Sequence, residues 1–246
     1  MGMAFMASGK TMSPVRRSFV APRSFFNWRK GRGAKGGATP QQLQFQYHDV
    51  ELSFPMSLVS NTHLRDRELK CCYRATVDGF SATDFHRQCD FKGPCVVVGR
   101  TDGGLRFGGF NPEGYRSTDD YYDTLDAFLF YWPEASAAGE TETSAAMPVV
   151  LPKVGGSGAA LFDYARGGPH FGADGLLIGP PLTAVMGVFT GPDASTGVGD
   201  LRSARSRLGL SYAKRADGKE SLFGNETRAK LVEVLVFCSP QVASLY

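Results

Sequence analysis

His86, Cys89 and Cys95 are the first residues whose types and spacing could support chemistry. His86 and Cys89 are one helical turn apart, so a short helix would present an imidazole and a thiol as two ligands of a metal corner. However, no second Cys/His pair occurs at ligand spacing, and Phe85 and Cys89 together would form the core face of that helix. The sequence therefore predicts no metal site and no cofactor.

The five cysteines form neither a CxxC motif nor an even disulfide framework, which is typical of a reducing interior. Cys71 and Cys72 are adjacent, so a strand would point their side chains to opposite faces. Cys95 and Cys238 lie in apolar strands, where a thiol is inert because the thiolate is disfavoured. We therefore predict no catalytic residue, and a thiol-dependent antioxidant enzyme is the alternative interpretation.

Two further motifs fall short of a reactive site. Ser157 lies in the run Gly155–Ala159, which lacks the last glycine of a nucleophile elbow and the strained strand-to-helix turn around it. Four aspartates also gather in one stretch, namely Asp119, Asp120, Asp123 and Asp126. They lack the glycine and terminal glutamate of a calcium loop, so they indicate a solvated acidic face.

Glu233 is the most unusual single residue, because it interrupts the apolar run Lys230–Phe237. Strand alternation places Glu233 on the same face as Leu235, and an inward face would bring its carboxylate into the core, where it must be paired. We predict a structural ion pair with Arg74. The alternative is an edge-strand charge that discourages aggregation.

The elements that would position these residues are dense between residues 70 and 110. Cys71–Thr76 is predicted as a strand that ends in a tight turn, where Asp78 and Gly79 supply the positive-φ position. The strand Cys95–Val98 follows, and the turn at residues 102–104 pairs it with Leu105–Phe107. We expect the next two glycines, Gly108 and Gly109, to mark a bulge or a close approach of another chain segment.

A capped helix is predicted over Ala82–Cys89. Ser81 can accept a hydrogen bond from the backbone N–H of Asp84, and the Asp84 carboxylate can reach back to Ser81, as in a capping box. Phe80 and Phe85 occupy the two positions of a hydrophobic staple. The coincidence of both signals fixes the start of the helix.

Short, turn-separated strands continue through the rest of the chain and favour an antiparallel sandwich over repeating βαβ units. The further strands are expected at Met147–Val154, Ala160–Tyr164, Leu176–Ile178, Leu210–Ala213 and Lys230–Phe237. Other helices are expected to be few and short, at Ser53–Asn61, Asp119–Leu125 and within the basic patch Ala194–Leu208. No apolar run approaches the roughly 20 residues of a membrane span.

Charge divides the chain at about residue 48. Residues 1–48 hold eight basic residues and no acid, whereas the rest holds 19 basic and 24 acidic residues. An acid-free start with arginine, serine, glycine and proline has the composition of an organelle transit peptide. Pro14 and Pro22 disfavour the sustained amphipathic helix of a mitochondrial leader, so we predict a disordered chloroplast transit peptide at 1–48.

Mitochondrial import is the alternative location, and a leader that is retained as a basic tail would instead place the protein in the nucleus or cytosol. Such a tail could contact phosphates of nucleic acid, but processing would remove this cationic segment, so no nucleic-acid binding is expected afterwards. Residues 49–246 suit one domain with a single sizeable core. A stretch rich in Ala, Ser, Glu and Thr at 134–146 is predicted as a flexible surface loop.

With these features assembled, the chain resembles the TLDc domain family over about residues 50 to 240. The resemblance is carried by the following motifs: Tyr73–Ser81 (YRATVDGFS), Phe85, Phe107–Gly109 (FGG), Ala127–Phe130 (AFLF), Gly168–Gly172 (GPHFG), Leu176–Ile178 and Leu231–Val234. The chain is most similar to short plant members that carry little beyond the domain. The positions we regard as its structural signature are Arg74, Asp78, Gly79, Phe80, Ser81, Asp84, Gly108, Gly109, Gly172 and Glu233.

The resemblance implies an α+β, mainly β fold in which two antiparallel sheets form a central sandwich with short helices around it. It also implies a role in oxidative-stress protection and, for several animal and fungal members, binding to the proton-pumping vacuolar ATPase. We therefore expect a non-catalytic protein-interaction module whose partner is not named by the sequence. A regulator that binds the proton pump is the alternative implied by the family.

Overall fold

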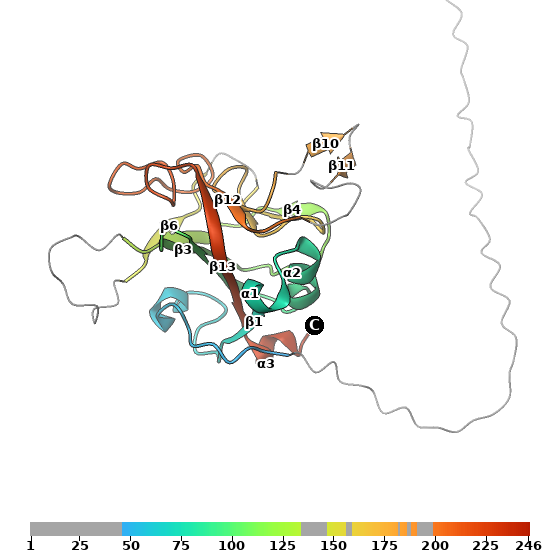
Figure 1. The fold of residues 1–246 in the computed structure, drawn as a ribbon. Coiled ribbons are helices and arrows are strands. Elements are labelled where there is room, and N and C mark those ends of the chain that lie inside the picture. Colours follow the sequence, from blue (N-terminus) through green and yellow to red (C-terminus); the bar gives the residue numbers. More distant parts are fainter. Residues whose placement is uncertain (1–45, 134–146, 156–158, 182, 186–187, 191–198) are drawn as a thin grey trace, which may run out of the picture. The chain divides into compact units, whose positions relative to one another are not determined.

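One strand organises the fold in this computed structural model. Strand β13 (Arg228–Cys238) pairs along one edge with β2 (Cys95–Thr101), while its other edge is shared by β12 (Ser203–Arg205) at one end and β1 (Lys70–Arg74) at the other. Figure 1 shows β13 running from β12 to β1 through the middle of the sheet. Both halves of the sheet are thus joined through a single strand.

The structure describes residues 46–133, 147–155, 159–181, 183–185, 188–190 and 199–246. These ranges belong to one compact unit, residues 44–246. The transit peptide predicted at 1–48 therefore lies almost wholly outside the described residues, and so does the loop predicted at 134–146.

The strands that complete the main sheet are β3 (Arg106–Asn111), β4 (Asp120–Tyr122), β5 (Phe128–Tyr131), β6 (Val149–Pro152), β7 (Leu161–Asp163), β8 (His170–Phe171) and β9 (Leu176–Ile178). Their order is β4-β7-β8-β9-β12-β13-β2-β3-β5-β6, with β1 beside β13, and neighbours are antiparallel. A separate two-stranded sheet joins β10 (Thr183–Val185) to β11 (Val188–Thr190). The helices are η1 (Met56–Val59, 3-10), α1 (Ala75–Asp78), α2 (Ala82–Cys89) and α3 (Pro240–Ala243).

The mainly β architecture with a few short helices agrees with the sequence, but the expectation of two sheets is wrong. The structure forms one strongly curled antiparallel sheet, because β13 is 11 residues long and contributes to both halves. Its register against β2 shifts between Leu231 and Glu233, and such an irregularity bends and twists a strand. A strand shared in this way is not visible in the pattern of any single segment.

Both faces of the central strands are buried, which explains their continuous apolar runs. On β2, Cys95 and Val97 face a larger core cluster, whereas Val96 and Val98 face a smaller one. Residues 54–69 supply the cover over the smaller cluster, with the buried side chains Phe54, Val59, Leu64 and Leu69. The larger cluster lies on the opposite face of β2, where Phe85 of α2 joins it.

Several predicted helices differ from the observed elements. The segment expected as a helix over Asp119–Leu125 contains strand β4, which pairs with β7 and places Tyr121 and Phe162 rings 6.3 Å apart. The segment Ser53–Asn61 forms only the four-residue helix η1, because Ser60 and Thr62 hydroxyls bond back to nearby carbonyls and compete with a longer helix.

The remaining differences concern strand boundaries and the basic patch. A helix was expected within the basic patch Ala194–Leu208. Residues 194–198 of this patch lie outside the described residues, and the rest contains strand β12. Leu210–Ala213 makes only an isolated bridge, between Tyr212 and Lys153. The strand expected at Cys71–Thr76 ends at Arg74, since the Asp78 carboxylate accepts the Arg74 backbone N–H at 2.8 Å and draws α1 into a helical turn.

Candidate functional site

The carboxylate of Glu233 accepts three hydrogen bonds from two residues among and beside the signature positions. Arg74 Nε donates to Glu233 Oε2 at 3.1 Å, the Thr76 hydroxyl donates to the same oxygen at 2.7 Å, and the Thr76 backbone N–H donates to Oε1 at 3.1 Å. The Glu233 side chain is 10% exposed and that of Arg74 is 41% exposed. The predicted ion pair is therefore confirmed, and Thr76 adds two further donors.

Asp78 holds the end of β1 against α1 and α2. Its Oδ2 accepts from the Arg74 backbone at 2.8 Å and contacts His48 Nε2 at 2.7 Å, while its Oδ1 accepts from Gln88 at 3.3 Å. Gly79 follows with φ +111, and a Cβ on it would lie 2.2 Å from Asp84 Oδ2. Only glycine fits at this position, both in backbone conformation and in space.

The cap of α2 forms much as the sequence predicts. Ser81 Oγ accepts from the Asp84 backbone N–H at 3.0 Å, and the Ser81 hydroxyl donates to Asp84 Oδ2 at 2.6 Å. The reciprocal bond therefore comes from the hydroxyl, whereas a capping box uses the backbone N–H. Phe80 packs against the larger core cluster, and the Arg202 guanidinium lies 4.4 Å from the centre of its ring.

The three remaining signature glycines permit close packing. A Cβ on Gly108 would lie 2.1 Å from the backbone oxygen of Val97, and one on Gly109 would lie 2.6 Å from the Phe171 ring. Gly172 has φ +65 and leaves 2.3 Å between an added Cβ and Ser211 Cβ. The register of β3 against β2 is continuous at both Gly108 and Gly109, so the close approach predicted there is confirmed and the bulge is absent.

All five cysteines are buried as free thiols. Burial raises the pKa of Cys71 to about 12 and that of Cys89 to about 11. Burial also raises the pKa values of Cys72 and Cys95, and the hydrogen bond with Cys72, together with burial, raises the pKa of Cys238. The positive charge of Lys92 acts to lower the pKa values of Cys72, Cys89 and Cys238, but the other effects outweigh it. These thiols therefore lack the exposure that makes a cysteine nucleophilic.

A serine, a histidine and an aspartate do meet, at the end of α2. His86 Nδ1 lies 2.8 Å from Asp90 Oδ1, and the Ser117 hydroxyl donates to Asp90 Oδ2 at 2.5 Å. His86 Nε2 faces the backbone oxygens of Tyr164 and Gly167 at 2.9 and 3.0 Å. Ser117 Oγ also lies 3.0 Å from His86 Nδ1, so the three side chains are within hydrogen-bond distance of one another. Because the Ser117 hydroxyl donates to Asp90 and both ring nitrogens face acceptors, His86 is oriented as a donor and not as a general base towards Ser117.

The pKa of His86 follows from the same contacts. Burial acts to lower it, but the hydrogen bond with Asp90 and the charges of Asp90 and Asp163 outweigh burial, so the pKa lies above its usual value. Through these contacts His86 ties α2 to the loop around residue 117 and to the segment 164–167. The cluster acts as an anchor between segments.

Asp163 is a second anchor, for which the sequence analysis predicted no role. It is 2% exposed, and its Oδ2 accepts from the backbone N–H of Arg116, the backbone N–H of Thr118 and the Thr118 hydroxyl at 2.9 to 3.2 Å. An acid inside the apolar stretch Ala160–Tyr164 is the signal that could have identified it, by the reasoning applied to Glu233.

The possible metal corner of His86, Cys89 and Cys95 does not form a ligand set, since the His86 nitrogens are engaged as described above. Across the described part of the chain, no group of three or more His, Cys, Asp or Glu side chains is arranged to hold a metal ion. Ser157 lies outside the described residues. The four aspartates of the acidic stretch fall in and around β4, where Asp120 is exposed.

Comparison with known protein families decides the classification. Residues 47–144 match the family model of the TLDc domain. Residues 47–144 therefore carry a TLDc domain. A search of curated proteins finds no match to the chain.

The TLDc match begins before β1 and includes the capped helix, the β2–β3 hairpin and β5. It is shorter than the span of about 50 to 240 expected from the resemblance. Gly172 and Glu233 lie beyond it, yet Glu233 contacts Arg74 inside it. The sheet of the TLDc domain is therefore completed by strands that follow the matched residues.

A groove lies between residues 57–65 and the strands β5 and β6. It has a volume of about 810 Å³, and its rim includes Leu125, which is 75% exposed, and Val150, which is 45% exposed. His63 and Arg65 line the same groove. Exposed large apolar side chains beside such a groove are typical of protein interaction sites.

None of the helices in the described ranges is long and apolar enough to cross a membrane.

Proposed function

We propose that this TLDc chain is a non-catalytic protein-interaction module that contributes to protection against oxidative stress. The observation that carries the proposal is the burial of every cysteine, with raised thiol pKa values, in a protein whose family resemblance points to oxidative stress. A protein with this resemblance but without an accessible thiolate would protect through a partner.

The binding surface in this proposal is the groove bordered by Leu125 and Val150. These two exposed apolar side chains border the same groove, where a bound partner would cover both of them. They also lie away from the Glu233 and Asp90 networks, so replacing them leaves the anchors of the fold in place.

The test combines two measurements on the full chain. Purified protein is assayed for peroxide consumption, and cells that express the protein are assayed for survival after peroxide treatment. The variants are Leu125→Asp with Val150→Asp, five single Cys→Ala changes, and the exposed control Leu210→Asp, which lies outside the groove.

We expect no peroxide turnover, protection that survives each Cys→Ala change, and loss of protection in the groove variant with its fold retained by circular dichroism. Turnover that one Cys→Ala variant abolishes would instead establish the thiol-dependent antioxidant enzyme. Equal protection by the groove variant and the Leu210→Asp control would remove the groove from the proposal.

Import into a chloroplast is part of the same proposal. Its support is the composition of residues 1–48, which hold eight basic residues and no acid. Fluorescence of a fusion of residues 1–48 to a reporter would locate the leader, with an Arg16→Glu/Arg17→Glu variant as control. A reporter that stays in the cytosol would reject import and favour binding to the vacuolar proton pump, which a stromal protein does not meet.

A further inference from the structure

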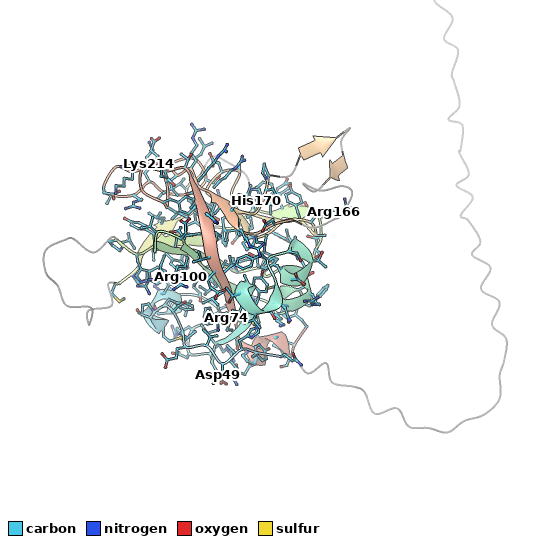
Figure 2. All side chains as sticks on the ribbon, in the orientation of Figure 1. Asp49, Arg74, Arg100, Arg166, His170 and Lys214 are labelled. Atoms are coloured by element: carbon cyan, nitrogen blue, oxygen red, sulfur yellow. The ribbon has the colours of Figure 1, made fainter. Side chains whose placement is uncertain are left out.

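A row of charged side chains crosses the sheet next to the Glu233 network. Glu233 of β13 is paired in register with Arg100 of β2, and Arg100 is paired with Arg106 of β3. Directly opposite residues of neighbouring strands project from the same face. The guanidinium of Arg106 lies 4.4 Å from the centre of the Trp132 ring, which ends the row. Arg74, labelled with Arg100 in Figure 2, meets the row from β1.

The charges in this row do not balance. Glu233 is compensated by Arg74 and by the two donors of Thr76. Among the described residues, neither Arg100 nor Arg106 has a side-chain hydrogen bond or a carboxylate partner. Like charges directly opposite in a sheet repel each other. Three guanidinium groups against one carboxylate leave two positive charges for an anion to neutralise.

A cleft lies over the row. It has a volume of about 320 Å³ and is lined by the three arginines, Glu233 and Ser53, with Gly99 in its wall. The Ser53 Oγ atom is buried and has no hydrogen-bond partner among the described residues. The apolar part of the lining is formed by Val50, Val98 and Leu235.

We propose that this cleft binds a small organic phosphomonoester. The phosphate dianion lies between Arg100 and Arg106, because a planar guanidinium matches phosphate oxygens with two parallel hydrogen bonds. The Ser53 hydroxyl donates to a further phosphate oxygen. The organic substituent packs on Val50, Val98 and Leu235. Two uncompensated positive charges match a phosphomonoester, which carries close to two negative charges at neutral pH.

This site is separate from the groove bordered by Leu125 and Val150, so either proposal can fail without the other. The ligand chemistry has two sources, a soluble phosphate ester and the headgroup of a membrane lipid. Both present the same terminal phosphate.

The experiment is a titration of the isotope-labelled full chain with phenyl phosphate, followed by the Nε–Hε signals of arginine in NMR spectra at constant ionic strength. Phenol and the monoanion benzenesulfonate serve as matched ligands without the dianion. We expect saturable shifts at Arg100 and Arg106 with phenyl phosphate, binding weaker by roughly tenfold with benzenesulfonate, and none with phenol. Shifts that grow without saturation would overturn the proposal.

Variants assign the binding to the row. Arg100→Gln and Arg106→Gln should each weaken phenyl phosphate binding by about tenfold or more, whereas Arg67→Gln, an exposed arginine outside the cleft, should leave it unchanged. Arg106→Lys keeps the charge and loses the planar guanidinium, so its affinity for phenyl phosphate should lie between those of Arg106→Gln and Arg67→Gln. Equal affinity of Arg100→Gln and Arg67→Gln would overturn the proposal even if phenyl phosphate binds.

Vesicles distinguish the two sources. Phosphatidic acid presents a phosphomonoester and phosphatidylglycerol presents only a diester at matched vesicle charge. The basic leader attracts any anionic surface. The readout is therefore the difference in vesicle binding between the wild type and Arg100→Gln. If Arg100→Gln binds less than wild type to phosphatidic acid vesicles only, the proposal is supported with a lipid as the source. If the two proteins bind vesicles equally while wild type still binds phenyl phosphate, the proposal is supported with a soluble ester as the source.

Discussion

Arg74 and Glu233 lie 159 positions apart in the sequence, and their side chains meet at 3.1 Å where β1 ends beside β13. The pair joins the start of the TLDc match to the strand that completes the sheet. The Glu233 side chain is 10% exposed and that of Arg74 is 41% exposed. Glu233 therefore depends more on the contact, because water can solvate Arg74 but hardly reaches Glu233.

We expect Glu233→Ala to lower the free energy of unfolding by about 2–3 kcal/mol, because Arg74 and both Thr76 donors lose their acceptor. Arg74→Ala should cost less, about 1–2 kcal/mol, since the two Thr76 donors still bind Glu233. Urea unfolding followed by circular dichroism measures both. The exposed pair Arg65 and Asp66 is the control, and Arg65→Ala should change stability by less than about 0.5 kcal/mol. An equal effect of all three changes would contradict a structural role for the pair.

Gly108→Ala should destabilise the domain by at least about 3 kcal/mol or prevent folding, because the added Cβ meets the Val97 backbone oxygen, which cannot move aside without disturbing β2. Gly103→Ala in the same hairpin is the matched control, since the nearest atom to its added Cβ is 3.8 Å away. Thermal unfolding of the two variants compares them directly. Similar melting temperatures would show that the β2–β3 contact is looser than the structure indicates.

His170 should make the domain less stable in acid. Burial lowers its folded-state pKa to about 4, below the unfolded value of 6.5, so the unfolded chain binds more protons between these values. Stability is therefore lost as the pH falls from about 6.5 towards 4, by about 2–3 kcal/mol at pH 4.5. His170→Phe keeps a ring stacked on Phe162, 4.5 Å away, and should remove this part of the pH dependence. Urea unfolding at pH 7 and pH 4.5 tests it, with the exposed His63→Gln as control.

A thiol reagent should label the native protein slowly and label all five cysteines after unfolding in urea. The native rate is low because the thiols are buried and burial disfavours the thiolate. The reagent absorbance followed over time, with and without urea, gives both rates. One cysteine that reacts at the unfolded rate in the native protein would contradict this expectation and would mark the residue to test for peroxide chemistry.

The parts of this molecule that the sequence predicts are those encoded by neighbouring residues. Ser81 and Asp84 are three positions apart, so their capping contacts and the bounds of α2 follow from local chemistry. The Glu233 pair could be predicted although its partner is distant, because a carboxylate in an apolar strand demands compensation and Arg74 is a cation on another predicted strand.

The parts that the sequence did not predict depend on distant segments. Strand β4 forms where a helix was expected, because β7 supplies its hydrogen bonds, and β7 begins about 40 residues later. The Asp90 and Asp163 anchors each bind loops that only the folded sheet brings near. The row of Arg100 and Arg106 needs the register of three strands, which no single segment specifies.

The place of β13 in the chain has a consequence for any shorter version of this protein. A fragment of residues 47–144, the span of the family match, would lack β13 and leave the facing edges of β1 and β2 bare. Unpaired backbone groups along an apolar edge recruit strands from other molecules, so such a fragment should precipitate and not fold independently. The boundaries of the recognisable motif and those of the autonomous folding unit are therefore different, and truncation experiments on the TLDc region should extend through Cys238.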